Sequence, residues 1–210
     1  SDFGTTDLST MSLRRYLATS DDPIPVLVRR VRRGWHRFTL PAPRIIVVPI
    51  LWVFIGLRFV WHEFLRLFVG EPMFKAYCKS YGKNFRGSIF IHWIMGKGDI
   101  ILGDNVEVRG KCSFGFAARF AERPTLIVGN NTNIGHSCSF TIGKRIQIGN
   151  NCLIASEVIM YDSNGHPSDP AARLKDLPLH EDDVRPIIIG DNVWVGQRTI
   201  ISPGVKIGDN

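Results

Sequence analysis

A six-residue repeat of apolar residues is the feature that most constrains this chain. Thirteen apolar residues keep this spacing within four groups. They are Leu102, Val108 and Phe114, then Val128, Ile134 and Phe140, then Ile148, Ile154 and Met160, and finally Ile189, Val195, Ile201 and Ile207. A strand repeats every two residues and a helix every 3.6. A sustained period of six predicts a solenoid in which each unit forms one short strand and one corner.

The residues around these anchors are typical of tight corners. A small residue often follows the anchor, and pairs of turn-forming residues recur between the units. The pairs are Asp104-Asn105, Asn130-Asn131, Asn150-Asn151 and Asp191-Asn192. Gly and Asn tolerate turn geometries that other residues resist. We therefore expect three units to form one triangular turn of a coil, with one apolar residue per side pointing inward.

The repeat is interrupted once, by a polar loop at residues 161–188. The loop opens with Ser163-Asn164-Gly165-His166-Pro167-Ser168-Asp169-Pro170. A histidine with a pKa near neutrality suits the removal of a proton from an attacking hydroxyl. His166 is therefore the candidate general base. The alternative is a histidine on a surface loop with no catalytic role.

The basic residues gather in the N-terminal region of a chain whose net charge is +7. Residues 26–38 mix Arg29, Arg30, Arg32 and Arg33 with aliphatic residues and Trp35 at helical spacing. This mixture favours a membrane surface with anionic lipid. A solvated basic helix and a nucleic-acid patch are the alternatives, and the neighbouring apolar run favours lipid over nucleic acid.

That apolar run, residues 45–57, contains no charged residue. It is shorter than the ~20 residues of a full span, and Pro49 is expected to kink it. We predict a re-entrant or interfacial helical hairpin, held by the arginines on the cytoplasmic face of the inner membrane. A buried helix is the alternative. We also expect a short helix around Met11 to Ala18, a helical linker over residues 71–85 and a strand over residues 87–94.

The cysteines and histidines do not form a metal-binding pattern. Cys78, Cys112, Cys138 and Cys152 lack C-x-x-C spacing, which favours reduced packing residues in a cytoplasmic protein. A zinc site of the γ-carbonic-anhydrase type needs three histidines, two of them close in sequence. His92, His136, His166 and His180 are spaced too widely for that site, so no metal is expected.

The chain resembles the hexapeptide-repeat acyltransferases, most closely the maltose, galactoside and nodulation O-acetyltransferases. The matching motifs are His166-Pro167-Ser168-Asp169-Pro170, Arg185-Pro186, Ile189 to Gly196, and Ser202 to Asn210. The resemblance covers roughly residues 99–210. It implies a mainly β fold, a left-handed parallel β-helix over residues 87–210, whose hand departs from the usual crossover rule. An α-helical region over residues 1–86 precedes it. The repeat stops at Asn210 without the cap of a solenoid, so further coils are expected.

The resemblance also implies an activity and its residues. Members move an acetyl group from acetyl-CoA to a hydroxyl, as homotrimers with active sites between adjacent subunits. The family's general base corresponds to His166. The coenzyme-binding positions correspond to Trp194, Gly196, Gln197 and Ser202. Relatives usually carry a small residue where Gln197 stands, which puts the side-chain part of that contact in doubt.

The acceptor side is less defined by sequence. Glycines stand where galactoside enzymes place sugar-binding side chains, so a simple galactoside is not expected. His136 is a candidate acceptor contact, or a residue packed at a trimer seam. Asp162 and Asp169 are candidate orienting partners of His166 through its second ring nitrogen, and each is alternatively a carboxylate that caps the loop. Asp162 is also a candidate substrate contact. Arg173 is a candidate contact to an anionic acceptor, or a solvated charge.

The function expected from these features is acetyl transfer to a sugar hydroxyl. Because the N-terminal region favours attachment to a membrane, the expected acceptor is a membrane-bound or lipid-linked glycan in surface polysaccharide synthesis. An acyltransferase that uses acyl carrier protein and a non-catalytic membrane-attached scaffold are the alternatives.

Overall fold

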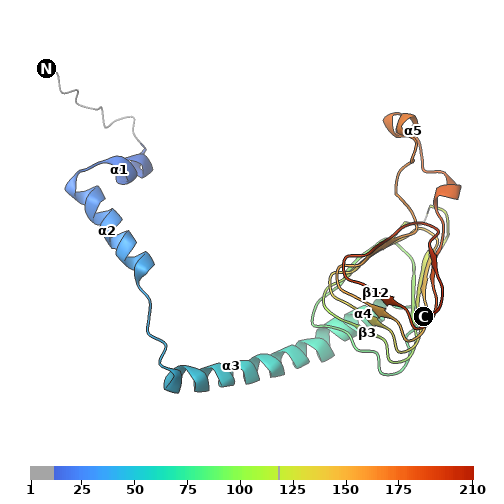
Figure 1. The fold of residues 1–210 in the computed structure, drawn as a ribbon, viewed down its shortest axis with the longest axis horizontal. Coiled ribbons are helices and arrows are strands. Elements are labelled where there is room, and N and C mark those ends of the chain that lie inside the picture. Colours follow the sequence, from blue (N-terminus) through green and yellow to red (C-terminus); the bar gives the residue numbers. More distant parts are fainter. Residues whose placement is uncertain (1–11, 118) are drawn as a thin grey trace. The chain divides into compact units, whose positions relative to one another are not determined.

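The computed structural model describes residues 12–117 and 119–210. These form two compact units, which divide between Phe54 and Ile55. Residues 1–11, the start of the predicted helical region, lie outside this description. The helical elements are α1 (Leu13–Thr19), α2 (Pro23–Arg37), α3 (Arg44–Leu65), the π-helical turn η1 (Arg66–Gly70), α4 (Glu71–Tyr77), α5 (Pro170–Leu174) and the 3-10 turn η2 (Glu181–Asp183) (Figure 1).

Helices α1 and α2 pack against each other through polar contacts. Arg29 Nη1 donates to the carbonyl oxygen of Leu17 at 3.0 Å, and the Tyr16 hydroxyl donates to Asp22 at 2.9 Å. Helix α1 confirms the short helix predicted near residues 11–18, although Met11 lies outside the described residues. The basic stretch forms α2, in which the exposed apolar residues recur at spacings of three and four and so share one face. They are Ile24, Leu27, Val28, Val31 and Trp35.

The apolar run does not form the predicted hairpin. It lies in α3, which continues without a turn through η1 into α4. Pro49 lies inside the helix, near its N-terminal end. There its missing N–H leaves one carbonyl without an intrahelical donor and does not end the helix. Within the described residues, Arg44–Tyr77 is the one helix long and apolar enough to cross a membrane by length and composition. An 18-residue window of this helix has a mean hydropathy of 2.0, and none of that window is buried.

The rest of the chain is a coil with three parallel sheets. One sheet has the order β1-β4-β7-β10-β13, the second β14-β11-β8-β5-β2 and the third β12-β9-β6-β3. The strands of the first sheet are β1 (Trp93–Met95), β4 (Ser113–Phe116), β7 (Ser139–Ile142), β10 (Ile159–Tyr161) and β13 (Ile200–Ile201). Those of the second are β2 (Asp99–Leu102), β5 (Thr125–Val128), β8 (Arg145–Ile148), β11 (Ile187–Ile189) and β14 (Lys206–Ile207). Those of the third are β3 (Glu107–Val108), β6 (Asn133–Ile134), β9 (Leu153–Ile154) and β12 (Trp194–Val195).

The strand register confirms the six-residue repeat. Each sheet contributes one column of predicted anchors to the interior. Phe114, Phe140, Met160 and Ile201 pair in one column, Leu102, Val128, Ile148, Ile189 and Ile207 in the second, and Val108, Ile134, Ile154 and Val195 in the third. All are buried except Ile207, which is half-buried. Cys112, Cys138 and Cys152 are buried in the same core, and all four cysteines are free thiols.

One corner of the coil is held by a ladder of asparagine side chains. Asn105, Asn131, Asn151 and Asn192 all have a positive φ, between 54° and 61°. The amide of Asn105 donates to Asn131 at 2.9 Å, and that of Asn131 donates to Asn151 at 3.1 Å. Because Asn tolerates this left-handed conformation, its recurrence permits a sharp corner in every turn.

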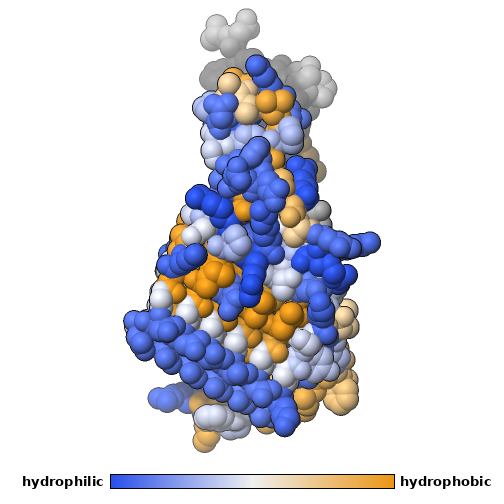
Figure 2. Space-filling view, turned by 90° about the vertical axis from the view of Figure 1, so that its right-hand side faces the viewer, coloured by the Kyte–Doolittle hydropathy of each residue, from blue (hydrophilic) through white to orange (hydrophobic). Residues whose placement is uncertain are grey.

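On one face of the molecule, hydrophobic surface is bordered by hydrophilic strips (Figure 2).

Helix α4 closes the first turn of the coil. Phe74 is 2% exposed and lies with its ring 4.4 Å from His92 and 5.5 Å from Phe114. The helical linker predicted to Phe85 is wrong beyond Tyr77, because Lys79 already bonds to the backbone of Ile100. The strand predicted over residues 87–94 is also misplaced. It begins at Trp93, because Ser88 instead bonds the Gly110 carbonyl and the Phe90 N–H through its hydroxyl.

His92 makes stability depend on pH. It is buried, and its Nδ1 accepts the Cys112 N–H at 3.1 Å. Burial lowers the pKa of His92 from 6.5 to about 4. The neutral ring therefore contributes stability that is complete above about pH 6.5 and is lost as the pH falls toward 4. A difference of about 2.5 pKa units corresponds to about 3 kcal/mol.

We expect His92→Asn, whose amide oxygen stands where Nδ1 does and can accept the same N–H, to remove this pH-dependent part of the stability. Denaturant unfolding between pH 7 and pH 4 should show a shallower loss of stability in the variant than in the wild type. Parallel pH profiles for the two proteins would contradict this role of His92.

Candidate active site

The loop between β10 and β11 is latched to the coil by Asp162. This side chain is fully buried, and its carboxylate accepts the backbone N–H groups of Gly143, Lys144 and Arg145, the last two at 2.7 Å. Its carbonyl oxygen accepts the Arg185 N–H at 2.9 Å, which joins the two ends of the loop. The predicted substrate contact through Asp162 is therefore wrong, because a buried carboxylate with three donors is not available to a ligand. Asp162 instead caps the loop, as in the alternative given for it from the sequence.

His166 stands exposed within this loop, after Gly165, whose φ is +78°. Its Nδ1 lies 3.3 Å from the Pro167 carbonyl oxygen. Because a carbonyl can only accept, this contact requires the proton on Nδ1 and leaves the lone pair of the neutral ring on Nε2. That is the tautomer in which Nε2 can remove a proton from a substrate.

Two clefts meet at His166. One has a volume of about 500 Å³. It is lined by Arg119, from the segment between β4 and β5, and by Arg173, Leu177 and other residues of the loop. The second, of about 470 Å³, is lined by Thr141, Tyr161, Ser163 and Asn164. His166 and Gly165 line both. A reactant in either cleft therefore lies against the histidine.

Arg173 supports the backbone around His166. It lies on α5, which Asp169 caps by accepting the Ala172 N–H at 2.7 Å. Arg173 Nη1 donates to the Pro167 carbonyl oxygen at 3.0 Å and also to that of Ser168. Arg173 thus holds the same carbonyl that orients the His166 ring, while it also lines the larger cleft. Asp169 therefore caps the helix within the loop, as in the loop-capping alternative given for it from the sequence.

The predicted coenzyme residues do not all gather at one place. Trp194 is 76% exposed on β12, and it lines a cavity of about 420 Å³ together with Gln197 and His136. Ser202 instead follows β13, where its hydroxyl lies 3.1 Å from that of Tyr161, a residue of the smaller His166 cleft. Gly196 is exposed beside Gln197, and a Cβ at this position would lie 3.9 Å from Thr199 Oγ1.

Sequence reasoning missed Ser156, which lines the same cavity as Trp194, and Glu157, which bonds the lining residue Gln197. Ser156 Oγ lies 2.7 Å from His136 Nδ1. Glu157 accepts from Gln197 at 3.0 Å and from Arg198 at 2.8 Å, and the Arg198 guanidinium holds the pKa of this carboxyl below its ordinary value. His136, Ser156 and Gln197 each stand two residues after an inward anchor. That shared offset was the signal that could have identified Ser156.

The chain therefore places its predicted residues in two groups. His166 and Ser202 belong to the side of the first sheet, whereas His136, Trp194 and Gln197 belong to that of the third. Among the residues that the structure describes, no cluster of three or more His, Cys, Asp or Glu side chains could hold a metal ion.

Replacing Asp162 by Asn should destabilise the fold. The amide places an NH₂ group where backbone N–H donors point, and it removes the charge that strengthens their bonds. We expect a loss of about 2–3 kcal/mol in the free energy of unfolding, measured with denaturant. Asp169→Asn is the matched control, because Asn caps helices as well as Asp does. Equal losses in both variants would contradict the latch.

Comparison with known proteins agrees with the repeat pattern. A model of the hexapeptide repeat of succinyl-transferase matches residues 125–160 and 186–210. Galactoside O-acetyltransferase of Escherichia coli K12 is 31% identical over 109 residues, which cover 52% of this chain and 48% of that protein. Nodulation protein L of Rhizobium meliloti is 30% identical over 110 residues, covering 52% and 53%.

A third relative is the polysialic acid O-acetyltransferase of Escherichia coli O1:K1, 36% identical over 80 residues that cover 38% of this chain and 25% of that protein. The chain spans about half the length of the first two relatives. The matched repeats coincide with the strands and inward columns described above. Over residues 125–160 and 186–210 the chain carries the hexapeptide repeat of this acyltransferase family, and in this part it is similar to O-acetyltransferases.

Proposed function

We propose that the protein is an O-acetyltransferase that moves an acetyl group from acetyl-CoA to a sugar hydroxyl, with His166 as the general base. The observation that carries this proposal is the position of His166. It stands on the loop that interrupts the repeat, between two clefts, with Nδ1 against a carbonyl and Nε2 free to accept a proton. The names of the relatives, O-acetyltransferases among them, support the reaction class.

In this reaction the Nε2 lone pair takes the proton of the acceptor hydroxyl as its oxygen attacks the thioester carbonyl. The carbon–sulfur bond then breaks, and the coenzyme A thiolate leaves and takes the proton from the imidazolium. The Pro167 carbonyl stabilises the charged ring through Nδ1–H, and Arg173 holds that carbonyl in place. Positioning both reactants against one histidine supplies a further part of the rate.

The separation of the predicted residues supports a site shared between subunits. We propose a homotrimer with the left-handed coil of its family, in which the His166 loop of one subunit faces the Trp194 cavity of the next. The pantetheine arm would lie along Trp194, Gly196 and Gln197. Because Gln197 is already bonded to Glu157, its backbone is the more available contact. Ser202 contacts Tyr161, which lines the smaller His166 cleft. Its hydroxyl would therefore contact whichever reactant occupies that cleft.

For the acceptor we propose a membrane-bound or lipid-linked glycan in surface polysaccharide synthesis. His136 with Ser156 and the cleft beside Arg173 offer hydrogen-bonding groups to sugar hydroxyls and to an anionic substituent. Helix α2 supports attachment to anionic lipid, because its apolar face is exposed and arginines occupy the rest of the helix. The exposed apolar helix α3 adds to that attachment, and a cytoplasmic location would give access to acetyl-CoA.

Substitution of His166 tests the catalytic role. We expect His166→Ala to lower kcat for thiol release from acetyl-CoA by about 100-fold or more, measured in the full-length protein with a membrane extract as acceptor. His180→Ala is the matched control, since His180 lies in the same loop but lines neither His166 cleft. Sedimentation should show unchanged assembly in both variants. Equal turnover in wild type and His166→Ala would place the base elsewhere, and no turnover in any of them would favour a scaffold.

Charge removal from α2 tests the lipid contact. Replacing Arg30, Arg32 and Arg33 together by Gln should weaken binding to anionic vesicles by more than about 100-fold. Each basic residue near such a surface contributes about 1 kcal/mol, and 1.4 kcal/mol is tenfold. The triple Lys variant keeps the charge and should bind like the wild type. Flotation at increasing salt gives the measurement, and equal binding of the Gln and Lys variants would contradict the proposal.

A further inference from the structure

The helix that ends at α4 is fixed tightly to the first turn of the coil. At Gly70 the helix backbone approaches the segment before β1 so closely that a Cβ would lie 2.0 Å from the Ser88 carbonyl oxygen. Only glycine permits this approach. Residues from Ile55 onward accordingly belong to the same compact unit as the coil.

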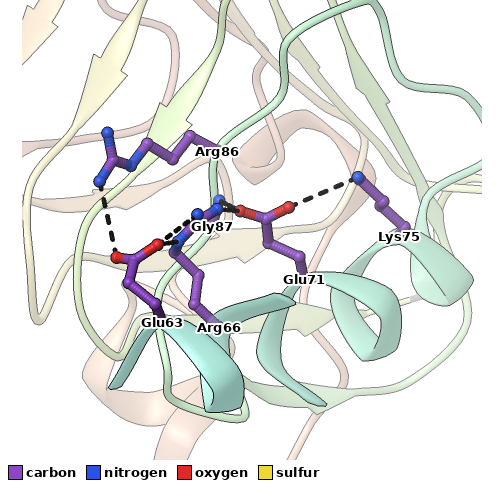
Figure 3. A network of polar contacts seen from close by, with 6 residues as sticks. All are labelled: Glu63, Arg66, Glu71, Lys75, Arg86 and Gly87. Carbon is purple, nitrogen blue, oxygen red and sulfur yellow. Dashed lines mark hydrogen bonds and ion pairs between the residues drawn. The ribbon is translucent and has the colours of Figure 1, made fainter. Parts of the chain in front are cut away.

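A network of charged side chains strengthens this junction (Figure 3). Glu71 is buried and accepts the Gly87 N–H at 3.2 Å, and it pairs with Arg66 and, at 3.5 Å, with Lys75. Arg66 also bonds Glu63 at 2.6 Å. A buried carboxylate is stable only when it is paired and hydrogen-bonded. Of these contacts, the Gly87 N–H and an ion pair between Arg86 and Glu63 at 4.0 Å join the helix to the coil.

Beside this junction the coil carries exposed apolar side chains, which we call the first-coil rim: Phe90, Ile91, Trp93 and Met95. The buried His92 and half-buried Ile94 alternate with them. Trp93 is 57% exposed and pairs with Ser113 on β4, which pairs with Ser139 on β7. Met95 likewise pairs with Gly115 and then Thr141. On these three neighbouring strands, the large apolar side chains of this outer face are therefore confined to β1.

The rim continues onto the helix. Phe64, Leu67 and Phe68 are exposed just before Gly70, and Gly70 touches the backbone of Ser88, two residues before Phe90. Apolar surface of this kind marks an interaction site. Its aromatic content, including Trp61 and Trp93, is typical of side chains at the boundary between hydrocarbon and head groups.

We propose that the first-coil rim, together with Phe64, Leu67 and Phe68, rests directly on the lipid bilayer. This inference rests on the proposed membrane attachment and adds that the coil itself, and not only the helices, contacts lipid. Lipid is the occupant because the helix that carries Phe64, Leu67 and Phe68 also contains an 18-residue window of mean hydropathy 2.0, none of which is buried. The charged junction makes the helix and the rim meet the bilayer as one surface.

This contact leaves the His166 loop in water. From β1 to β10 the first sheet takes three strand steps, through β4 and β7. At ~4.8 Å a step, the base of the loop lies about 14 Å from β1 along the coil. The head-group layer on each side of a bilayer is only about 5–7 Å deep. The rim can therefore touch lipid while acetyl-CoA and the sugar part of a lipid-linked acceptor meet outside the head groups.

Site-directed spin labelling of the full chain tests this contact. Nitroxides are attached at Ile91→Cys and, as the matched control, at Ile200→Cys, in a Cys78→Ala background. Both isoleucines are about half exposed or more, at 50% and 60%, and Ile200 belongs to the same sheet four strands from β1. On addition of phosphatidylcholine–phosphatidylglycerol vesicles, collisions of the label at 91 with a polar nickel chelate should fall about tenfold, because hydrocarbon excludes that complex. The label at 200 should change by less than about twofold.

The other outcomes separate the two proposals. If the chain floats with vesicles but the label at 91 stays accessible, the rim contact is wrong and membrane attachment stands. If the wild type does not float, both fail. Protection at 91 without vesicles that disappears on dilution would show a second copy of the chain on the rim, and would overturn the inference.

Discussion

The left-handed backbone of the coil corners is the constraint on which the rest of the structure depends. Asn105, Asn131, Asn151 and Asn192 occupy this conformation in successive turns, and the amides of the first three bond one another. Without a sharp corner at a fixed place, the strands could not stack in register. The inward columns, such as Phe114, Phe140 and Met160, would then lose their alignment.

A rigid coil also explains how one loop can carry chemistry. The Asp162 carboxylate takes its three donors from the corner between β7 and β8, so the loop is fixed to a neighbouring turn and not only to its own strand. From that latch the chain reaches His166, whose ring is oriented through Pro167 and Arg173. The histidine is thus exposed to reactants while the backbone that aims it is held.

The N-terminal half shows where local patterns mislead. A thirteen-residue apolar run with a proline indicated a hairpin, yet the helix continues to Tyr77 because Phe74 fills the open end of the coil and Glu71 pairs with Arg66 and Gly87. The strand expected from Gly87 begins only at Trp93, since the Gly70 contact and the Ser88 bonds occupy the preceding segment. These contacts join residues that no local period relates.

The sequence by itself determined the repeating unit, the inward anchors, the asparagine corners and the exposed histidine loop. Each follows from short-range chemistry: apolar burial every six residues, and the few residue types that accept a positive φ. Only the tertiary structure decided that Asp162 is a latch, that Ser156 meets His136, and that the site residues fall on two sheets. Those outcomes depend on which turns lie side by side, and a side chain's partners one turn away are about twenty residues distant in sequence.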